Sequence, residues 1–164
     1  MADILAAHAE ANPGGTAVIV DAAGGGTPSA TTFAELNATV NRLAHAFGAL
    51  GAHRGERMVW CGPNSLEVLV TLHAARKAGL TAVPLSYRFN ADEMAYVVDN
   101  SDATLVVVDA EQAPTLASVS QRLSKVREFI VFGGDAPPGF RSWDDVLDGQ
   151  LATELDTTSD ASAG

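Results

Sequence analysis

The amino-acid sequence predicts an α/β fold: a mostly parallel, doubly wound sheet with helices on both faces. Candidate strands and helices alternate from residue 57 onward, and the strands are nearly continuous apolar runs, as in sheets covered on both sides. Residues 76–109 carry a helix end, a strand, a helix and a strand without interruption. Because consecutive strand–helix–strand units have right-handed crossovers, their strands are expected to be parallel.

The N-terminal elements precede this alternation. Asp3 to Ala11 is predicted to form a short helix that ends before Pro13. Thr16 to Val20 is a predicted strand, followed by a glycine turn at Gly24 to Gly26 that is expected to form a plain hairpin or loop.

Residues 33–50 are predicted to form the main helix. Thr32 and Glu35 have the spacing of a capping box, and Gly51 ends the helix. Apolar residues recur at three- and four-residue steps, at Phe33, Leu36, Val40, Leu43, Phe47 and Leu50. One face of this helix is therefore expected to be buried.

Arg57 to Cys61 is the first predicted strand of the main sheet. Asn64 and Glu67 form a second predicted capping box, which opens a helix that runs to Lys77 and ends at Gly79.

Leu80 to Leu85 is the next apolar strand. Asn90, with Glu93 three residues later, is predicted to cap a further helix, and Thr104 to Val108 is a second buried strand.

Three elements complete the predicted domain: a helix over Ala113 to Ser124, a strand over Glu128 to Phe132 and a short capped helix over Ser142 to Leu147. We therefore expect one α/β domain over residues 1–147. Residues 148–164 contain acidic but no basic side chains and are rich in Thr, Ser, Ala and Gly, which is typical of a linker or disordered tail.

Composition limits the classes of function. With 164 residues, 47% hydrophobic and 18% charged, the chain is typical of one globular domain. A net charge of −10, with Lys77 and Lys125 as the only lysines, argues against nucleic-acid or anionic-membrane partners. A single cysteine, no signal-peptide pattern and no apolar run near the roughly 18 residues of a membrane span predict a cytoplasmic protein.

The residue patterns predict neither a catalytic residue nor a metal site. There is no glycine-rich phosphate loop after a strand, and no base lies near Cys61 in the sequence. The four histidines, His8, His45, His53 and His73, lack metal-binding spacing. The turn at residues 61–65 follows a strand, where α/β sheets bind ligands, and is expected to be structural.

Three stretches carry a family resemblance. They are residues 31–37 (TTFAELN), residues 55–65 (GERMVWCGPNS) and residues 77–88, with Lys77-Ala78-Gly79, Val83-Pro84-Leu85 and Arg88. In order and spacing they resemble the motifs of the acyl-adenylate-forming (AMP-binding) enzymes, which include acyl-CoA synthetases, peptide-synthetase adenylation domains and luciferases. The resemblance covers about Ile4 to Gly164 and implies the N-terminal subdomain of such an enzyme.

The resemblance implies the N-terminal portion of an acyl-CoA synthetase, an ATP-dependent ligase that joins a carboxylic acid, above all a fatty acid, to AMP and then to CoA. The implied ligands of the parent enzyme are ATP, Mg and CoA. Arg88 is the one site residue carried over, as a contact of a CoA phosphate, since a guanidinium binds phosphate through two N–H groups. The alternative for Arg88 is a surface arginine that bonds a loop carbonyl.

The ATP-binding motifs of the family are absent from the sequence, and residues 159–164 resemble the stretch just before its phosphate loop. We expect the chain alone to bind no cofactor, to be inactive, to need the remainder of the adenylation domain as its partner, and to self-associate through exposed apolar surface. Two alternatives stay open. One is a free-standing flavodoxin-like binding or interaction module without catalysis, and the other is a non-catalytic partner protein derived from the ligase.

Overall fold

A parallel sheet forms the centre of the molecule. The computed structural model describes residues 3–21 and 26–156. The sheet contains β3 (Arg57–Cys61), β4 (Thr81–Pro84), β5 (Ala103–Asp109), β6 (Glu128–Phe132) and β7 (Arg141–Ser142). Their order is β4-β3-β5-β6-β7, and all neighbouring pairs are parallel. The chain adds β4 on one side of β3 and the later strands on the other, so the predicted doubly wound sheet is confirmed, with its switch point between β3 and β5.

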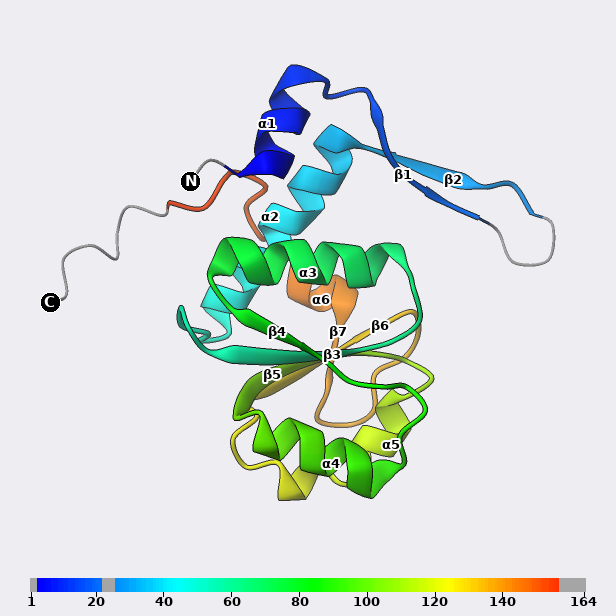
Figure 1. Cartoon of the computed structure of the whole chain (residues 1–164), viewed down its shortest axis with the longest axis vertical. Helices are drawn as coiled ribbons and strands as arrows, with labels where there is room; N and C mark the ends of the chain where they lie inside the picture. The colour runs from blue at the N-terminus through cyan, green and yellow to red at the C-terminus, as the bar shows by residue number, and fades with distance from the viewer. Residues whose placement is uncertain (1–2, 22–25, 157–164) are drawn as a thin grey trace, which may run out of the picture.

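Helices cover both faces of this sheet, as predicted (Figure 1). One face carries α2 (Phe33–Ala49), α3 (Leu66–Ala78) and α6 (Trp143–Leu147), and the other carries α4 (Ala91–Asn100) and α5 (Ala113–Ala117). Along β5 the side chains alternate between two apolar clusters, with Leu105 and Val107 facing α2 and α3, and Val106 and Val108 facing α4 and α5. Each of these four side chains is fully buried, and burial of one such side chain contributes about 1.5–3 kcal/mol.

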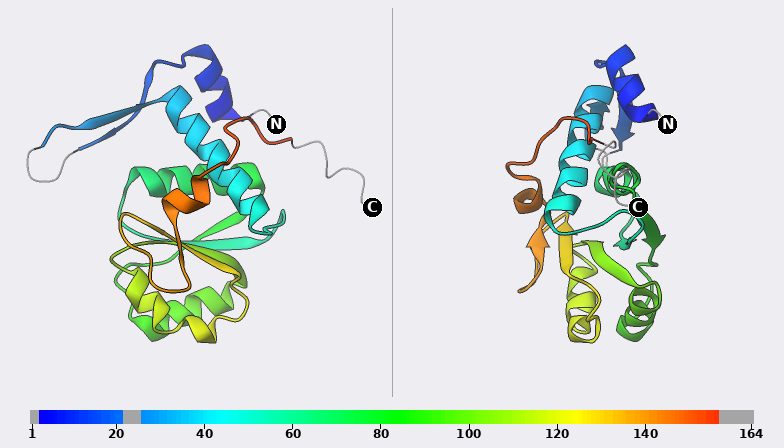
Figure 2. Two further views of the ribbon diagram at one scale, coloured as in Figure 1. Left: turned by 180° about the vertical axis from the view of Figure 1, so that it is seen from behind. Right: turned by 90° about the vertical axis from the view of Figure 1, so that its left-hand side faces the viewer.

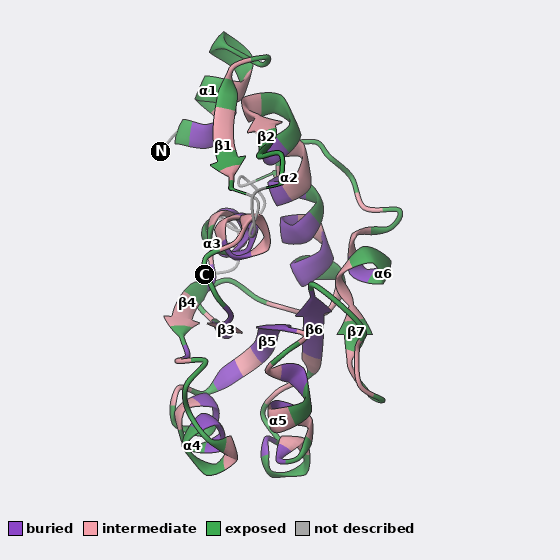
Figure 3. Ribbon diagram, turned by 90° about the vertical axis from the view of Figure 1, so that its right-hand side faces the viewer, coloured by how far each residue is buried: buried purple, intermediate pink, exposed green. Residues whose placement is uncertain are grey.

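Burial is concentrated in the middle strands and on one side of the longest helix. Figure 3 shows buried residues along β5 and β6 and on the sheet-facing side of α2. The predicted apolar face of α2 is confirmed, because Val40, Leu43 and Phe47 are 0% exposed. No helix within residues 3–21 and 26–156 is long and apolar enough to cross a bilayer.

The N-terminal elements stand apart from the main sheet. α1 (Ile4–Ala11) packs against α2, and β1 (Thr16–Val20) pairs antiparallel with β2 (Ser29–Thr32) in a separate two-stranded sheet. This hairpin projects away from the helical layers (Figure 1, Figure 2). β1 confirms the predicted strand, whereas β2 is not predicted. Gly24 and Gly25 of the predicted turn lie outside the described residues.

Two of the three predicted capping boxes are confirmed. Thr32 with Glu35 caps α2, and Asn90 with Glu93 caps α4; in both cases the two reciprocal hydrogen bonds are present.

The box predicted for α3 is wrong. Ser65 is its N-cap, in an extended backbone conformation, and its Oγ accepts a hydrogen bond from the Val68 N–H at 3.2 Å. The helix therefore begins one residue later than the Asn64–Glu67 pair predicts. At its other end Gly79 has φ 73°, a left-handed conformation that favours glycine, so the predicted C-cap is confirmed.

The helix predicted over residues 113–124 is also corrected. The chain forms only α5 and a short 3₁₀ turn at Ser120–Arg122. The hydroxyl groups of Ser118 and Ser120 donate to carbonyl oxygens three residues earlier, at 2.7 and 2.9 Å. Serine side chains that bond the local backbone in this way compete with a regular helix. The remaining predicted strands and helices are present, with ends that differ by at most two residues.

Candidate functional site

An open cavity lies at the carboxyl end of β3 and β4. Its volume is about 550 Å³, and it is lined by Trp60, Gly62, Pro63, Asn64, Pro84, Leu85, Ser86, Tyr87 and Phe89. The residues come from the turn after β3 and the loop after β4, next to the switch point of the sheet. Doubly wound folds bind their ligands outside the carboxyl ends of the strands, and this cavity lies at that edge, on the β4 side of β3. The cavity is therefore the candidate ligand site of the domain.

A tight turn after β4 positions Arg88. The Leu85 N–H bonds the Trp60 carbonyl oxygen at 2.9 Å, and the Phe89 N–H bonds the Ser86 carbonyl oxygen at 3.2 Å. The Arg88 N–H also donates to Ser86 Oγ at 3.3 Å. These bonds fix the backbone on both sides of Arg88, whose side chain is exposed.

The Arg88 guanidinium is exposed at the rim of this loop. Its central carbon lies 5.7 Å from the centre of the Tyr87 ring, a distance that permits a cation–π contact. Within the described ranges no carboxylate forms an ion pair with it. The guanidinium therefore keeps its N–H donors available for an anionic ligand.

Cys61 lies at the end of β3 and is buried. Burial, with a smaller effect of the nearby Asp109 carboxylate, raises the pKa of the thiol to about 12. The thiol therefore stays protonated at neutral pH and is a poor nucleophile. It packs as an apolar side chain beneath the turn at Gly62, where a Cβ would lie 2.7 Å from the Phe132 ring, so that only glycine fits this close approach.

Asp109 is a buried acid at the carboxyl end of β5. Burial raises the pKa of its carboxyl group, although the Gln112 N–H donates to Oδ1 at 3.3 Å. No cluster of three or more His, Cys, Asp and Glu side chains capable of holding a metal ion occurs within the part of the chain that the structure describes.

A polar site that was not predicted from the sequence surrounds Lys77, in the last turn of α3. The Lys77 side chain is only 4% exposed. Its Nζ donates to Asn37 Oδ1, Asn41 Oδ1 and Glu154 Oε2, each at 2.7 Å. A second acid, Asp3, lies 3.7 Å away. We call these five residues the Lys77 cluster.

Glu154 ties residues 152–154 to α2 within this cluster. Its Oε1 accepts hydrogen bonds from the side-chain amides of Asn37 at 2.7 Å and Asn41 at 3.0 Å. Asn41 also donates to the Ala152 carbonyl oxygen at 2.9 Å, and His45 Nε2 lies 2.9 Å from the Thr153 carbonyl oxygen. Burial alone would raise the pKa of Glu154, but the hydrogen bonds from Lys77 and the two asparagines outweigh it and lower the pKa.

Asp3 joins α1 to the same cluster. Its Oδ1 accepts the Ala6 N–H at 2.9 Å and so caps α1, while Oδ2 pairs with Arg76. The spacing of Asn37 and Asn41 on the buried side of an otherwise amphipathic helix is the sequence signal that could have indicated this site.

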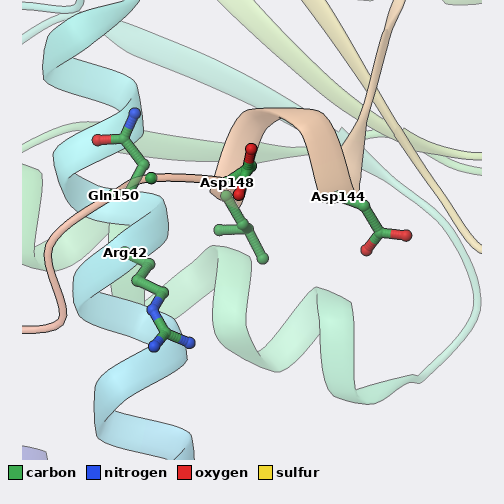
Figure 4. A pocket seen from close by; sticks show the side chains of 6 residues that line it. Arg42, Asp144, Asp148 and Gln150 are labelled. Carbon is green, nitrogen blue, oxygen red and sulfur yellow. The ribbon is translucent and has the colours of Figure 1, made fainter.

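A second cavity, of about 470 Å³, lies between α2 and α6. Figure 4 shows Arg42 extending from α2, with Asp144, Asp148 and Gln150 contributed by α6 and the residues after it. No ion pair joins Arg42 to either acid among the described residues. The two carboxylates and Arg42 are therefore interpreted as solvated surface side chains.

The comparison with protein families identifies the class of this fold. The model of the family described as AMP-binding enzyme matches residues 5–158. The chain belongs to the AMP-binding enzyme family, and the resemblance found in its sequence motifs is confirmed.

Similar proteins are CoA ligases of several kinds. A feruloyl-CoA synthase of Amycolatopsis sp is 38% identical over 96 residues, which are 58% of this chain and 19% of that protein. The long-chain-fatty-acid–CoA ligase FadD13 of Mycobacterium tuberculosis (strain ATCC 25618 / H37Rv) is 34% identical over 88 residues, or 54% and 18% of the two chains. A solved structure of a long-chain-fatty-acid CoA ligase from Rhodopseudomonas palustris CGA009, described as putative, matches with a TM-score of 0.80 and 27% identity.

The matches extend over a limited part of each relative. The match to the solved structure covers 91% of this chain but only 36% of the other chain. The matches to the two curated relatives cover about a fifth of the length of each. The matched part is the N-terminal part of these enzymes.

Proposed function

We propose that the chain is the N-terminal portion of an ATP-dependent acyl-CoA synthetase. The carrying observation is the family match over residues 5–158, combined with relatives that are CoA ligases and are about five times as long as the matched segment. This match supports the ligase over the flavodoxin-like module, although the strand order suits both.

The proposed reaction has two steps. A carboxylate oxygen attacks the α-phosphorus of ATP and displaces pyrophosphate, which gives an acyl-adenylate. The CoA thiol then loses its proton and attacks the acyl carbon, and AMP leaves. The first step needs fixed cationic and N–H donors around the phosphates, and Mg is expected to supply part of that charge in the parent enzyme.

This chain would contribute the scaffold and the Arg88 loop. The sheet and its two helical layers hold the carboxyl-end cavity in place, and Arg88 is proposed to contact a CoA phosphate. Two observations support that role: the guanidinium is exposed, and it pairs with no carboxylate in the described ranges. Because the family's ATP-binding motifs are absent from residues 1–164, we propose that the chain alone neither binds ATP productively nor forms an adenylate.

Fatty acids are the proposed substrates, with the remainder of the adenylation domain as partner and the cytoplasm as location. The matched relatives include ligases named for a long-chain fatty acid and for ferulic acid. A test of the substrate class therefore needs both aliphatic and aromatic acids.

The experiment begins with the coding sequence beyond Gly164. We expect it to continue into a Thr/Ser/Gly-rich loop that ends in Pro-Lys-Gly, and the longer protein to form acyl-CoA thioesters, detected by mass spectrometry, with fatty acids in preference to hydroxycinnamic or hydroxybenzoic acids. The 164-residue chain should give no exchange of labelled pyrophosphate into ATP. A stop codon after Gly164 with no ligase sequence nearby would refute the proposal, and exchange by the short chain would refute its inactivity.

A further inference from the structure

The Lys77 cluster joins four parts of the chain that are far apart in sequence. Asp3 caps α1, Asn37 and Asn41 lie on α2, Lys77 lies on α3, and Glu154 comes after α6. An ammonium group has three N–H donors, and Lys77 Nζ has three oxygen atoms at 2.7 Å. With its donors occupied and its side chain buried, Lys77 is unsuited to act as a nucleophile or as a ligand contact.

The four parts of the chain differ in how far the Lys77 cluster is needed to hold them in place. α1, α2 and α3 contribute apolar side chains to the core, including Leu5, Leu43 and Val70. Residues 149–156 form neither helix nor strand, and within them only Leu155 packs against the same core. The polar contacts of this segment with α2 and α3 include those of the Ala152 and Thr153 carbonyls and of the Glu154 carboxylate.

The figures show the course of this segment. In Figure 2 it runs from α6 along α2 toward α1, so it crosses the helical layer on the face away from the sheet. The side-chain amides of Asn37 and Asn41 meet Glu154 Oε1, and Lys77 meets Oε2, so both carboxylate oxygens are held. A carboxylate bound at both oxygens restrains the direction of the backbone that carries it.

We propose that Lys77 is a positioning residue, which holds residues 152–154 on α2 and thereby fixes where the polypeptide beyond Asp156 leaves the domain. Its significance for catalysis rests on the proposed function, since residues 159–164 resemble the stretch before a phosphate loop. Lys77 would then act on ATP binding only through the path of the backbone, without contact to the nucleotide.

The test measures local opening of the segment in the 164-residue chain. Thermolysin cleaves before leucine, so the rate of cleavage at the Glu154–Leu155 bond reports release of the segment. Because such cleavage follows the population of the locally open form, Lys77→Met should raise the rate on the order of tenfold or more. Cleavage before Leu105, which is 0% exposed within β5, serves as an internal reference for global unfolding.

Matched variants separate positioning from general destabilisation. Lys125→Met removes the other lysine, which pairs with Asp99 and Asp102 at the surface, and should leave cleavage at the Glu154–Leu155 bond unchanged. Glu154→Ala breaks the contact from the segment side, where the side chain is 47% exposed, and should give the same increase while Asn37 and Asn41 still accept hydrogen bonds from Lys77. Glu154→Gln, which keeps one acceptor oxygen, should be intermediate.

Each outcome decides the proposal. A rise at the Glu154–Leu155 bond that exceeds the rise before Leu105, in either Lys77→Met or Glu154→Ala, supports it. An equal rise at both bonds, or no rise in folded Glu154→Ala, overturns it even if Lys77→Met does not fold. The assay contains no ATP, CoA or acid, so failure here leaves the proposed ligase reaction to its own test of thioester formation.

Discussion

Lys77 and Arg88 are two cations close together in sequence that the fold uses in opposite ways. Lys77 is 4% exposed and has an oxygen partner for each N–H donor, whereas Arg88 is exposed, lies over Tyr87 and pairs with no carboxylate in the described part of the chain. β4 lies between the two residues along the chain. The first lies inside the helical layer, and the second lies at the carboxyl edge of the sheet.

Because of this difference, Lys77 and Arg88 should affect different measurements. A buried cation with all its partners contributes to architecture, and its loss leaves other buried polar groups without partners. An exposed cation contributes little to folding and keeps its donors available to a ligand. Lys77 should therefore be detected by stability measurements and Arg88 by ligand binding.

The largest expected effect is that of Lys77→Met. Removal of the ammonium leaves Glu154, Asn37 and Asn41 without their shared donor. Because Glu154 is 47% exposed, the loss should be about 1.5–3 kcal/mol, as for a hydrogen bond to a charged group, and below that of a fully buried ion pair. Urea denaturation followed by circular dichroism measures the free energy of unfolding. Lys125→Met, at an exposed ion pair, should cost less than about 1 kcal/mol. Equal losses of stability in the two variants would show that the buried Lys77 contributes no more to folding than the exposed Lys125.

A smaller effect is expected at the N-terminus of α3, the helix that carries Lys77. Ser65→Ala removes the hydroxyl that caps Val68 and should cost about 1 kcal/mol, whereas Asn64→Ala should stay within about 0.5 kcal/mol. Thermal unfolding of the two variants side by side gives the difference. If Asn64→Ala were the more damaging, the assigned N-cap would be incorrect.

Glu56 forms an ion pair with Arg127 that is partly exposed, so its environment is intermediate between those of Lys77 and Arg88. The hydrogen bond from Arg127, together with those from the His53 N–H and Thr104, lowers the pKa of Glu56 to about 2. Its stabilisation is therefore complete above the ordinary glutamate pKa of about 4.3 and is lost as the pH falls toward 2. At this partly exposed site the effect should be at most about 1 kcal/mol.

Glu56→Gln tests this pH dependence. Over the interval from the ordinary glutamate pKa down to the shifted one, the variant should lose less stability than the unmodified chain, because its side chain does not titrate. Urea midpoints at several pH values give the two slopes. Parallel slopes would show that the Glu56–Arg127 pair does not contribute.

Arg88→Ala should have the smallest effect on folding, within about 0.5 kcal/mol, because the side chain is exposed and unpaired in the described ranges. In the longer ligase it should raise the KM for CoA by roughly tenfold, the cost of one charged hydrogen bond, and leave the KM for ATP unchanged. Arg42→Ala, at another exposed arginine, is the control. Dephospho-CoA, which lacks the 3′-phosphate, shows which phosphate Arg88 contacts. If the contact is with the 3′-phosphate, the KM for dephospho-CoA should be the same in Arg88→Ala and in the unmodified enzyme.

Much of the fold could be predicted because its signals are local. Apolar runs such as the one ending at Leu85 mark strands buried on both faces, and the Thr32–Glu35 and Asn90–Glu93 pairs mark helix starts within four residues. β2 escaped prediction because Ser29–Thr32 lacks an alternating apolar pattern and is held by its pairing with β1. Ser65 was missed because Asn64 offers an equally good capping residue one position earlier.

Arg88 and the Lys77 cluster also differ in whether a local sequence signal marks them. Arg88 follows a recognisable strand and could be named from its motif, although its ligand stays a proposal. The Lys77 cluster depends on Glu154, 77 residues away, in a segment whose acidic composition is typical of a linker. Pairing at that separation is set by the packed helices and leaves no local pattern.

The distance between Lys77 and Glu154 also has a consequence for biosynthesis. A ribosome that adds ~5–20 residues per second makes the carboxylate roughly 4–15 s after the lysine. During that interval α3 and the strands through β6 have already been made, so Lys77 meets its asparagine partners and water first. The cluster can therefore close only after Glu154 has been made, which makes the docking of residues 152–154 on α2 a late step in the biosynthesis of this segment.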